Sequence, residues 1–209
     1  MNILIIPDSF KGSLSAIQVS EAISDGIKKI LPDSVLKKIP FSDGGEGAID
    51  FLNYIGDGES ENIFTENSIG TKIQAPIYWI KKNKIAWIEL SQASGLSALD
   101  DNDKNPMMTS TFGTGILINH ALNKGCEKIY VGLGGSSTHD LGSGIFMALG
   151  GELLNKDYLP ISRGGQGLSD CEKIIFNNLN YTIQNCEIIL AADVNNTLLG
   201  VNGAAKIYS

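Results

Sequence analysis

Arginine is almost absent from this chain, because Arg163 is the only one among 209 residues. Phosphate binding therefore cannot depend on an arginine cluster, and cationic contacts must come from lysine. Acidic residues outnumber basic ones by 23 to 16, and the formal net charge is −7. This sign disfavours nucleic acid and anionic membrane surfaces as partners. A small anionic ligand stays compatible, because a local group of N–H donors and lysines can outweigh the net charge.

Cysteine is scarce as well, with Cys126, Cys171 and Cys186 alone. Their odd number argues against a disulfide framework, and because their spacing is not that of metal ligands and only two histidines are present, no structural zinc site is expected. Long apolar runs are missing too, so no membrane span is expected. The short apolar stretch at residues 1–6 ends at Pro7 and reads as a buried strand, not a targeting segment. We therefore expect a cytoplasmic protein.

The first fifty residues alternate strand and helix patterns. Residues 3–6 and 35–39 read as strands. Ser15 opens a helix with Gln18 in the capping-box position, and a second helix is expected at residues 45–54. This order predicts a parallel sheet with right-handed crossovers.

The pattern changes near residue 58, where closely spaced strands replace the alternation. Pro76 weakens the middle strand of this group or places it at a sheet edge. We expect strands at residues 63–65, 72–80 and 84–90 with a turn at 81–83, a helix at 111–123, and strands at 129–133 and 186–192. The change of pattern alone suggests a domain boundary around residues 65–75.

The most informative segment is residues 134–140, Gly-Gly-Ser-Ser-Thr-His-Asp, which follows a predicted strand and precedes a predicted helix. Such a glycine-rich turn lets backbone N–H groups approach an anion closely. The alternative is a tight turn whose hydroxyl groups cap the helix. Taken alone, the segment does not decide between an anion site and a cap.

Acids follow the predicted strands repeatedly, as Asp8, Asp43, Asp140 and Asp193. Ligands of open α/β sheets bind beyond the carboxyl ends of the strands, so these acids could share one cleft. Carboxylates with hydroxyl neighbours such as Ser9 suit Mg²⁺ and phosphate chemistry. Each acid taken alone is better explained as a turn or helix-cap residue than as a catalyst, and their recurrence shifts this balance without deciding it.

Two further polar residues, Lys11 and Glu46, also have both a functional and a purely structural interpretation. Lys11 precedes a helix start, where it could neutralise phosphate or remain a solvated loop lysine. Glu46 could bind a metal or a substrate hydroxyl, or simply occupy a first helical turn. Glu89, Ser91 and Ser94 are expected to face the cleft.

Five ordered blocks together resemble the bacterial glycerate kinases of the first type, and they extend from one end of the chain to the other. They lie at residues 7–16, 42–47, 110–115, 132–140 and 193–205. The chain departs from the family pattern at Leu141, where glycine is usual, and at Ser143, where alanine is usual. Family members are also nearly twice as long.

The resemblance implies ATP-dependent phosphorylation of D-glycerate with Mg²⁺. It also implies a flavodoxin-like (Rossmann-like) α/β domain, incomplete here, with a second α/β domain of restriction-endonuclease type inserted into it. Residues 1–70 would then form the first part of the flavodoxin-like domain, and residues 71–209 the insert.

Residue type and placement assign roles within this framework. Lys11 would contact the glycerate carboxylate or the transferred phosphate, and Asp43 or Asp193 would hold Mg²⁺ or orient the attacking hydroxyl. The alternative is a non-catalytic small-anion-binding fragment or one subunit of a split kinase. Partners are then D-glycerate and ATP, with a homo-oligomer or a missing C-terminal half as further alternatives. The predicted substrate- and phosphate-binding residues are Asp8, Ser9, Glu46, Gly134, Gly135, Ser136, Ser137 and Asp140.

Overall fold

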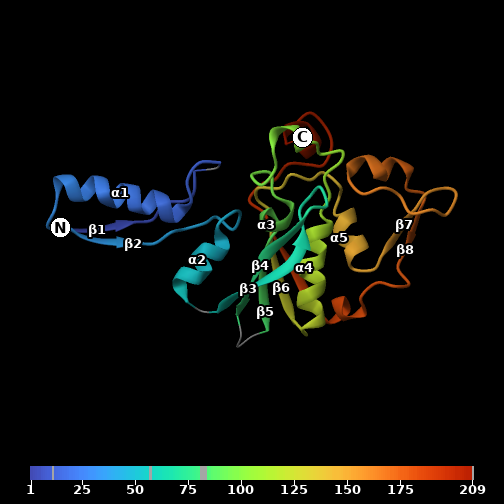
Figure 1. Ribbon diagram of the computed structural model, residues 1–209, viewed down its shortest axis with the longest axis horizontal. Coiled ribbons are helices and arrows are strands. Elements are labelled where there is room, and N and C mark those ends of the chain that lie inside the picture. The colour runs from blue at the N-terminus through green and yellow to red at the C-terminus, as the bar shows by residue number, and fades with distance from the viewer. Residues whose placement is uncertain (11, 57, 81–83, 209) are drawn as a thin grey trace.

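The computed structural model describes residues 1–10, 12–56, 58–80 and 84–208 (Figure 1). Helix α1 and strands β1 and β2 form an outlying N-terminal unit on the left of that view, and most other elements gather to its right. The turn predicted at residues 81–83 lies outside the described residues. In the described ranges, no helix combines the length and apolar character needed to cross a bilayer.

The N-terminal unit is a strand–helix–strand element. Strands β1 (Asn2–Ile5) and β2 (Val35–Lys38) pair in parallel and are connected through α1 (Ala16–Ile30). The predicted capping box is present, because the Gln18 N–H donates to Ser15 Oγ at 3.3 Å and the Ser15 N–H donates to Gln18 Oε1 at 2.9 Å. The predicted helix start and the predicted parallel pairing are confirmed.

A five-stranded mixed sheet forms the centre of the larger part. Its order is β3 (Glu59–Glu66), β4 (Lys72–Ile80), β5 (Ile85–Glu89), β6 (Lys128–Gly132) and β9 (Glu187–Ala191). The pairs β3–β4 and β4–β5 are antiparallel, whereas β5–β6 and β6–β9 are parallel. The carboxyl ends of β5, β6 and β9 therefore meet at one edge of the sheet.

Strand β4 is an interior strand, so of the two alternatives predicted for Pro76, a weakened strand or a sheet-edge position, the second is wrong. Pro76 lies opposite Asn62 of β3, and the pairing of β4 with β5 begins only at Tyr78. At residue 76 the strand thus has a neighbour on one side alone. Proline lacks a backbone N–H, and this local opening accommodates it.

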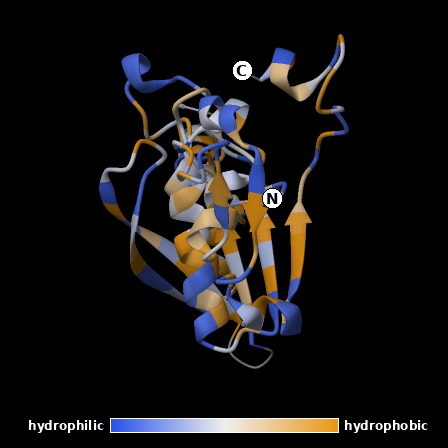
Figure 2. Cartoon of the chain, turned by 90° about the vertical axis from the view of Figure 1, so that its right-hand side faces the viewer, coloured by the Kyte–Doolittle hydropathy of each residue, from blue (hydrophilic) through white to orange (hydrophobic). Residues whose placement is uncertain are grey.

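Helices cover both faces of this sheet. Helix α4 (Phe112–Asn123) packs on one face with residues such as Leu117, against a fully buried row that includes Ile88 and Ile129. Residues alternate between the faces of a strand, and Tyr78 lies on the other face, where its hydroxyl donates to the Leu52 carbonyl of α2 (Ala48–Ile55) at 2.9 Å. Figure 2 shows hydrophobic residues concentrated in the strands.

The remaining elements are short. Most of them connect the strands of the central sheet or form a small antiparallel pair of β7 and β8, and α6 follows the last strand. Their bounds are α3 (Ser91–Ser94), η2 (Asp101–Asp103), α5 (Ser143–Ala148), β7 (Glu152–Leu154), η3 (Gly165–Asp170), β8 (Lys173–Ile175), η4 (Tyr181–Asn185) and α6 (Ala204–Ile207).

The structure is mixed α/β with several small sheets, as the sequence predicts at this level. Residue 70 lies in the turn between β3 and β4, which pair along their length in one sheet. Helix α2 packs on the same sheet. A boundary at residue 70 would divide this sheet, and the division into residues 1–70 and 71–209 stays a prediction.

The N-terminal unit has an uncovered apolar face. Leu4, Ile6 and Val35 point away from α1 by strand alternation and are 55%, 50% and 65% exposed. Parallel strands are ordinarily covered on both faces. We call these three residues the open face of the unit.

Candidate active site

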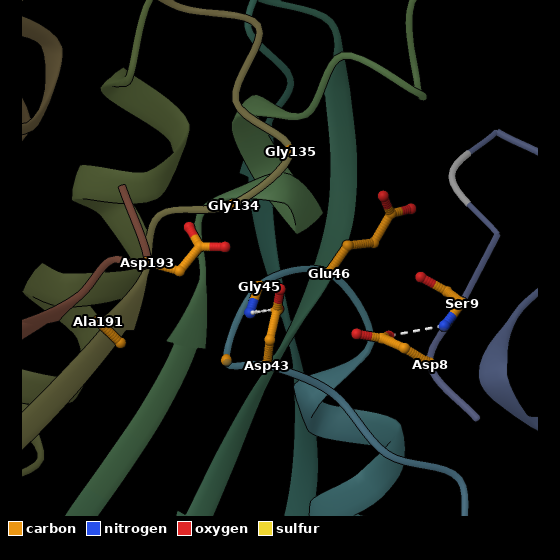
Figure 3. A pocket seen from close by; sticks show the side chains of 10 residues that line it. Asp8, Ser9, Asp43, Gly45, Glu46, Gly134, Gly135, Ala191 and Asp193 are labelled. Atoms are coloured by element: carbon orange, nitrogen blue, oxygen red, sulfur yellow. Dashed lines mark hydrogen bonds between the residues drawn. The ribbon is translucent and has the colours of Figure 1, made fainter. Parts of the chain in front are cut away.

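A cavity of about 80 Å³ lies where the carboxyl ends of the parallel strands meet the loops of the N-terminal unit (Figure 3). Most of its lining comes from segments that directly follow β1, β2, β6 and β9. The predicted convergence of strand-end acids is therefore found for three of the four. The lining residues are Asp8, Ser9, Asp43, Gly44, Gly45, Glu46, Gly134, Gly135, Ala191 and Asp193.

Two glycine-containing loops touch backbone to backbone at this cavity. A β-carbon on Gly134 would lie 2.7 Å from the Gly45 Cα, and one on Gly45 would lie 3.4 Å from the Gly134 Cα. The first distance is too short for any side chain, so Gly134 must be glycine for the loops to approach. Part of the glycine-rich sequence is thereby explained by packing between loops.

Asp8 and Asp43 each use one carboxylate oxygen in a local turn. The Ser9 N–H donates to Asp8 Oδ1 at 2.6 Å, and the Gly45 N–H donates to Asp43 Oδ1 at 3.0 Å. Both side chains are exposed in the cavity. The turn interpretation thus accounts for one oxygen of each carboxylate, and the second has no hydrogen bond to any of the described residues and is available to a ligand.

Glu46 and Asp193 complete the acidic lining. The Ser97 hydroxyl donates to Glu46 Oε1 at 3.4 Å, a long contact. For Asp193 no hydrogen bond is found with any residue that the structure describes. Figure 3 shows Asp43, Glu46 and Asp193 around the space beside Gly134 and Gly135. These carboxylates therefore have oxygens available for a cation or a substrate hydroxyl.

Three other predicted residues lie outside this cavity. The Ser136 and Thr138 hydroxyls share a hydrogen bond at 2.9 Å. The Ser137 N–H and hydroxyl both donate to the Ser94 carbonyl, at 2.9 and 3.0 Å. Asp140 is only 1% exposed. The contacts of Ser136, Ser137 and Asp140 stabilise the loop and give no support to phosphate binding by their side chains.

Asp140 links the starts of α4 and α5. Its carboxylate accepts from the N–H of Thr111 at 2.8 Å and from the N–H groups of Gly142 and Gly144 at 3.1 and 3.2 Å. This is the capping interpretation of the loop, realised by the acid rather than by the serines. Leu141 adopts a φ of 54° and is 68% exposed, so its side chain points to solvent.

Replacing Asp140 with asparagine is expected to lower the free energy of unfolding by about 2 kcal/mol, because an amide NH₂ would then face backbone donors in a buried site. Urea denaturation followed by circular dichroism measures this change. The exposed Asp157 provides the matched control, and Asp157→Asn should change stability by less than about 0.5 kcal/mol. Equal effects of the two substitutions would show that the Asp140 network does not stabilise the fold.

The predicted lysine, Lys11, lies outside the described residues. Among the residues that are described, no lysine or arginine lines the cavity. The same part of the chain contains no group of three or more side chains placed to hold a metal ion. Magnesium usually binds through one or two carboxylates together with substrate phosphates, and this acidic lining fits that mode.

Glu89, Ser91 and Ser94 do not line this cavity, although the sequence places them in the cleft. Ser94 is fully buried and its hydroxyl bonds with Thr114 Oγ1 at 2.9 Å. Glu89 is 1% exposed, and this burial raises the pKa of its carboxyl group. The sequence reasoning omitted Gly44, Gly45 and Ala191 from the site, although the first two directly follow Asp43.

A second cavity of about 350 Å³ adjoins the first and shares Ser9 and Glu46 with it. It lies between the start of α1 and the residues Asp50, Gln92 and Ser97. Glu46 thus stands between two neighbouring spaces, and ligands in both could contact it.

Fold and cavity together define a mixed α/β protein with a small polar cavity beyond the carboxyl ends of its parallel strands, the place where ligands of open α/β sheets bind. The pattern of the glycerate kinase family matches residues 3–209. The chain belongs to the glycerate kinase family.

Individual relatives agree with this assignment. The chain is 39% identical over 206 residues to the glycerate kinase of Halalkalibacterium halodurans, covering 99% of this chain and 54% of the relative. It is 37% identical over 208 residues to the glycerate 2-kinase of Escherichia coli, covering 100% of this chain and 55% of the relative.

A solved structure shows the same fold. The protein described as glycerate kinase 2 from Salmonella typhimurium LT2 superimposes with a TM-score of 0.80 at 37% identity, over 100% of this chain and 56% of that one. The chain therefore spans about half the length of the relatives it matches.

Proposed function

We propose that this chain is the N-terminal part of an ATP-dependent glycerate kinase, which transfers the γ-phosphoryl group of ATP to a hydroxyl of D-glycerate. The observation that carries the proposal is the meeting of Asp8, Asp43, Glu46 and Asp193 with Gly134 and Gly135 in one cavity of a glycerate kinase family member. Five curated relatives bear the name glycerate kinase and one the name glycerate 2-kinase.

In the proposed reaction, a glycerate hydroxyl oxygen attacks the γ-phosphorus of ATP. The bond from that phosphorus to the bridging oxygen breaks, ADP leaves, and the hydroxyl proton passes to a base. Asp43 or Asp193 serves as this base or orients the hydroxyl, because both have carboxylate oxygens open to the cavity. The backbone N–H groups of Gly134 and Gly135 contact phosphate, and Lys11 neutralises it or the glycerate carboxylate.

Magnesium is the proposed metal, with Asp43 and Asp193 as its carboxylate ligands. When bound, it neutralises charge on the transferring phosphoryl group. Asp8 and Ser9, which follow β1, and Glu46, which lies in the loop before α2, then bind and orient the substrate. The two adjoining cavities provide separate room for a three-carbon acid and for a larger nucleotide.

We extend the proposal to the domain arrangement and to the location of the protein in the cell. The parallel β1–α1–β2 unit fits the start of a flavodoxin-like domain, and the mixed sheet fits an inserted second domain. The open face of the unit would then be covered by sequence corresponding to the other half of the relatives. A cytoplasmic location is proposed with it.

A coupled kinase assay with ATP and D-glycerate tests the function. The chain is assayed alone and after addition of the separately produced C-terminal part of the Escherichia coli relative. We expect phosphoglycerate in the combined sample, dependent on Mg²⁺ and absent without D-glycerate. Turnover by the chain alone would support the kinase and show that this half suffices. No product in either sample would contradict the kinase and favour a small-anion-binding fragment.

A further inference from the structure

Glu89 is a buried acid that the proposed reaction does not use. It ends strand β5, and its side chain reaches the first turn of α2. Glu89 Oε2 accepts from the Gly47 N–H at 3.2 Å, Oε1 accepts from the Ile49 N–H, and the Gln92 amide donates to Oε2 at 3.1 Å. Burial is the larger influence and raises the pKa of the Glu89 carboxyl group, while the three donors around the carboxylate act in the opposite direction and favour its ionised form.

Helix α2 has no cap of its own among the described residues. Its N-cap is Gly47, with a φ of 91° and no side-chain hydrogen bond. The first N–H groups of a helix need acceptors, and a negative charge there is stabilising. Glu89 supplies both the acceptor oxygens and the negative charge, from a strand end 40 residues after Ile49.

The loop that Glu89 secures is part of the cavity lining. Residues 43–46 immediately precede Gly47, so fixing Gly47 fixes one end of that loop. Its middle is held by close backbone contact, because a β-carbon on Gly132 would lie 2.5 Å from the Gly44 carbonyl oxygen. Gly132 is the register partner of Glu89 across β5 and β6. Two adjacent strand ends therefore hold the same loop at two points.

We propose that Glu89 is a positioning residue of the candidate site, which holds residues 43–46 against Gly134 and thereby sets the place of Asp43 and Glu46. The catalytic part of this inference rests on the proposed kinase function. Its structural part, the immobilisation of residues 43–46, does not.

The test compares Glu89→Gln with Tyr78→Phe. Glutamine has the same shape but brings a donor among three donors, which releases the N-terminal end of α2. Tyr78→Phe removes the hydroxyl that donates to Leu52 and weakens the attachment of the same helix away from the loop. Both variants lose a hydrogen bond to α2, and only Glu89→Gln loosens the end that carries the site.

Hydrogen exchange at the backbone amides of residues 44–49 is the first readout. We expect exchange about tenfold faster in Glu89→Gln, because a hydrogen bond to a charged group is lost, and unchanged exchange there in Tyr78→Phe. If Glu89→Gln does not fold, Glu89→Asp is measured instead, since its shorter side chain keeps the charge and loses reach. Wild-type exchange at residues 44–49 in the folded variant would overturn the proposal.

The assay with ATP and D-glycerate is the second readout. Glu89→Gln should lower kcat about tenfold with little change in KM, whereas a purely structural cap would lower thermal stability and leave both constants unchanged. If the wild type turns over and Glu89→Gln matches it, the positioning role fails while the kinase stands. If the wild type produces nothing, the kinase fails and the exchange readout still decides the role of Glu89.

Discussion

Replacing Asp43 with asparagine is expected to lower the kcat for D-glycerate phosphorylation about 10³-fold, within the range for loss of a general base. The amide lacks the negative charge that either accepts the hydroxyl proton or holds Mg²⁺. The fold should survive, because the amide oxygen can still accept the Gly45 N–H that Asp43 Oδ1 now accepts. The coupled assay described above measures kcat, and circular dichroism confirms the fold.

Asp25→Asn is the matched control for this substitution. Asp25 is an exposed aspartate on α1, and the same chemical change there should leave kcat unchanged. Near-normal turnover of Asp43→Asn would remove Asp43 from the catalytic machinery. Asp193 would then be the remaining candidate for the base.

Alanine at Gly134 is expected to lower the free energy of unfolding by about 3 kcal/mol, at the upper end of the usual cost of overpacking. The new β-carbon would lie 2.7 Å from the Gly45 Cα, which is backbone and cannot rotate away. The two loops must separate, so turnover should fall together with stability. Thermal or urea unfolding and the coupled assay measure the two effects.

Gly26→Ala is the opposite case and serves as the control. Gly26 lies inside α1, and a β-carbon there would meet no atom within 4 Å. Alanine should stabilise this helix by about 0.5–1 kcal/mol through its higher helix propensity. A Gly134→Ala variant as stable and as active as the wild type would show that the loops can part without consequence.

Local sequence signals predicted much of the fold. The capping box of Ser15 and Gln18 depends on contacts three residues apart, and the structure contains it. Pro76 predicted a local weakening of its strand, and at residue 76 the strand pairs on one side alone. The interior place of β4 in the sheet, in contrast, depends on where pairing with β5 begins. That register is set by packing far along the chain, which a local pattern does not contain.

The candidate site was likewise predictable from the sequence only in part. Strand-end position brought Asp8, Asp43 and Asp193 together in one cavity, as the α/β rule predicts. The loop at residues 134–140 could not be resolved from sequence, because the reasons for Gly134 and Asp140 lie in Gly45 and Thr111, respectively. Such long-range partners become visible only when the chain is folded.

The open face of β1 and β2 has a thermodynamic consequence for the cavity. Asp8 and Ser9 follow β1 directly, so the strand pair that carries the uncovered apolar residues also carries one side of the ligand site. If a polypeptide binds the open face and shifts the N-terminal unit, it also moves Asp8 and Ser9 in the cavity, and the affinity for a ligand there changes by some factor. By linkage, the ligand must change the affinity for that polypeptide by the same factor. Under the proposed function, covering of the open face and ligand binding would therefore be reciprocal quantities, and either one could be used to measure the other.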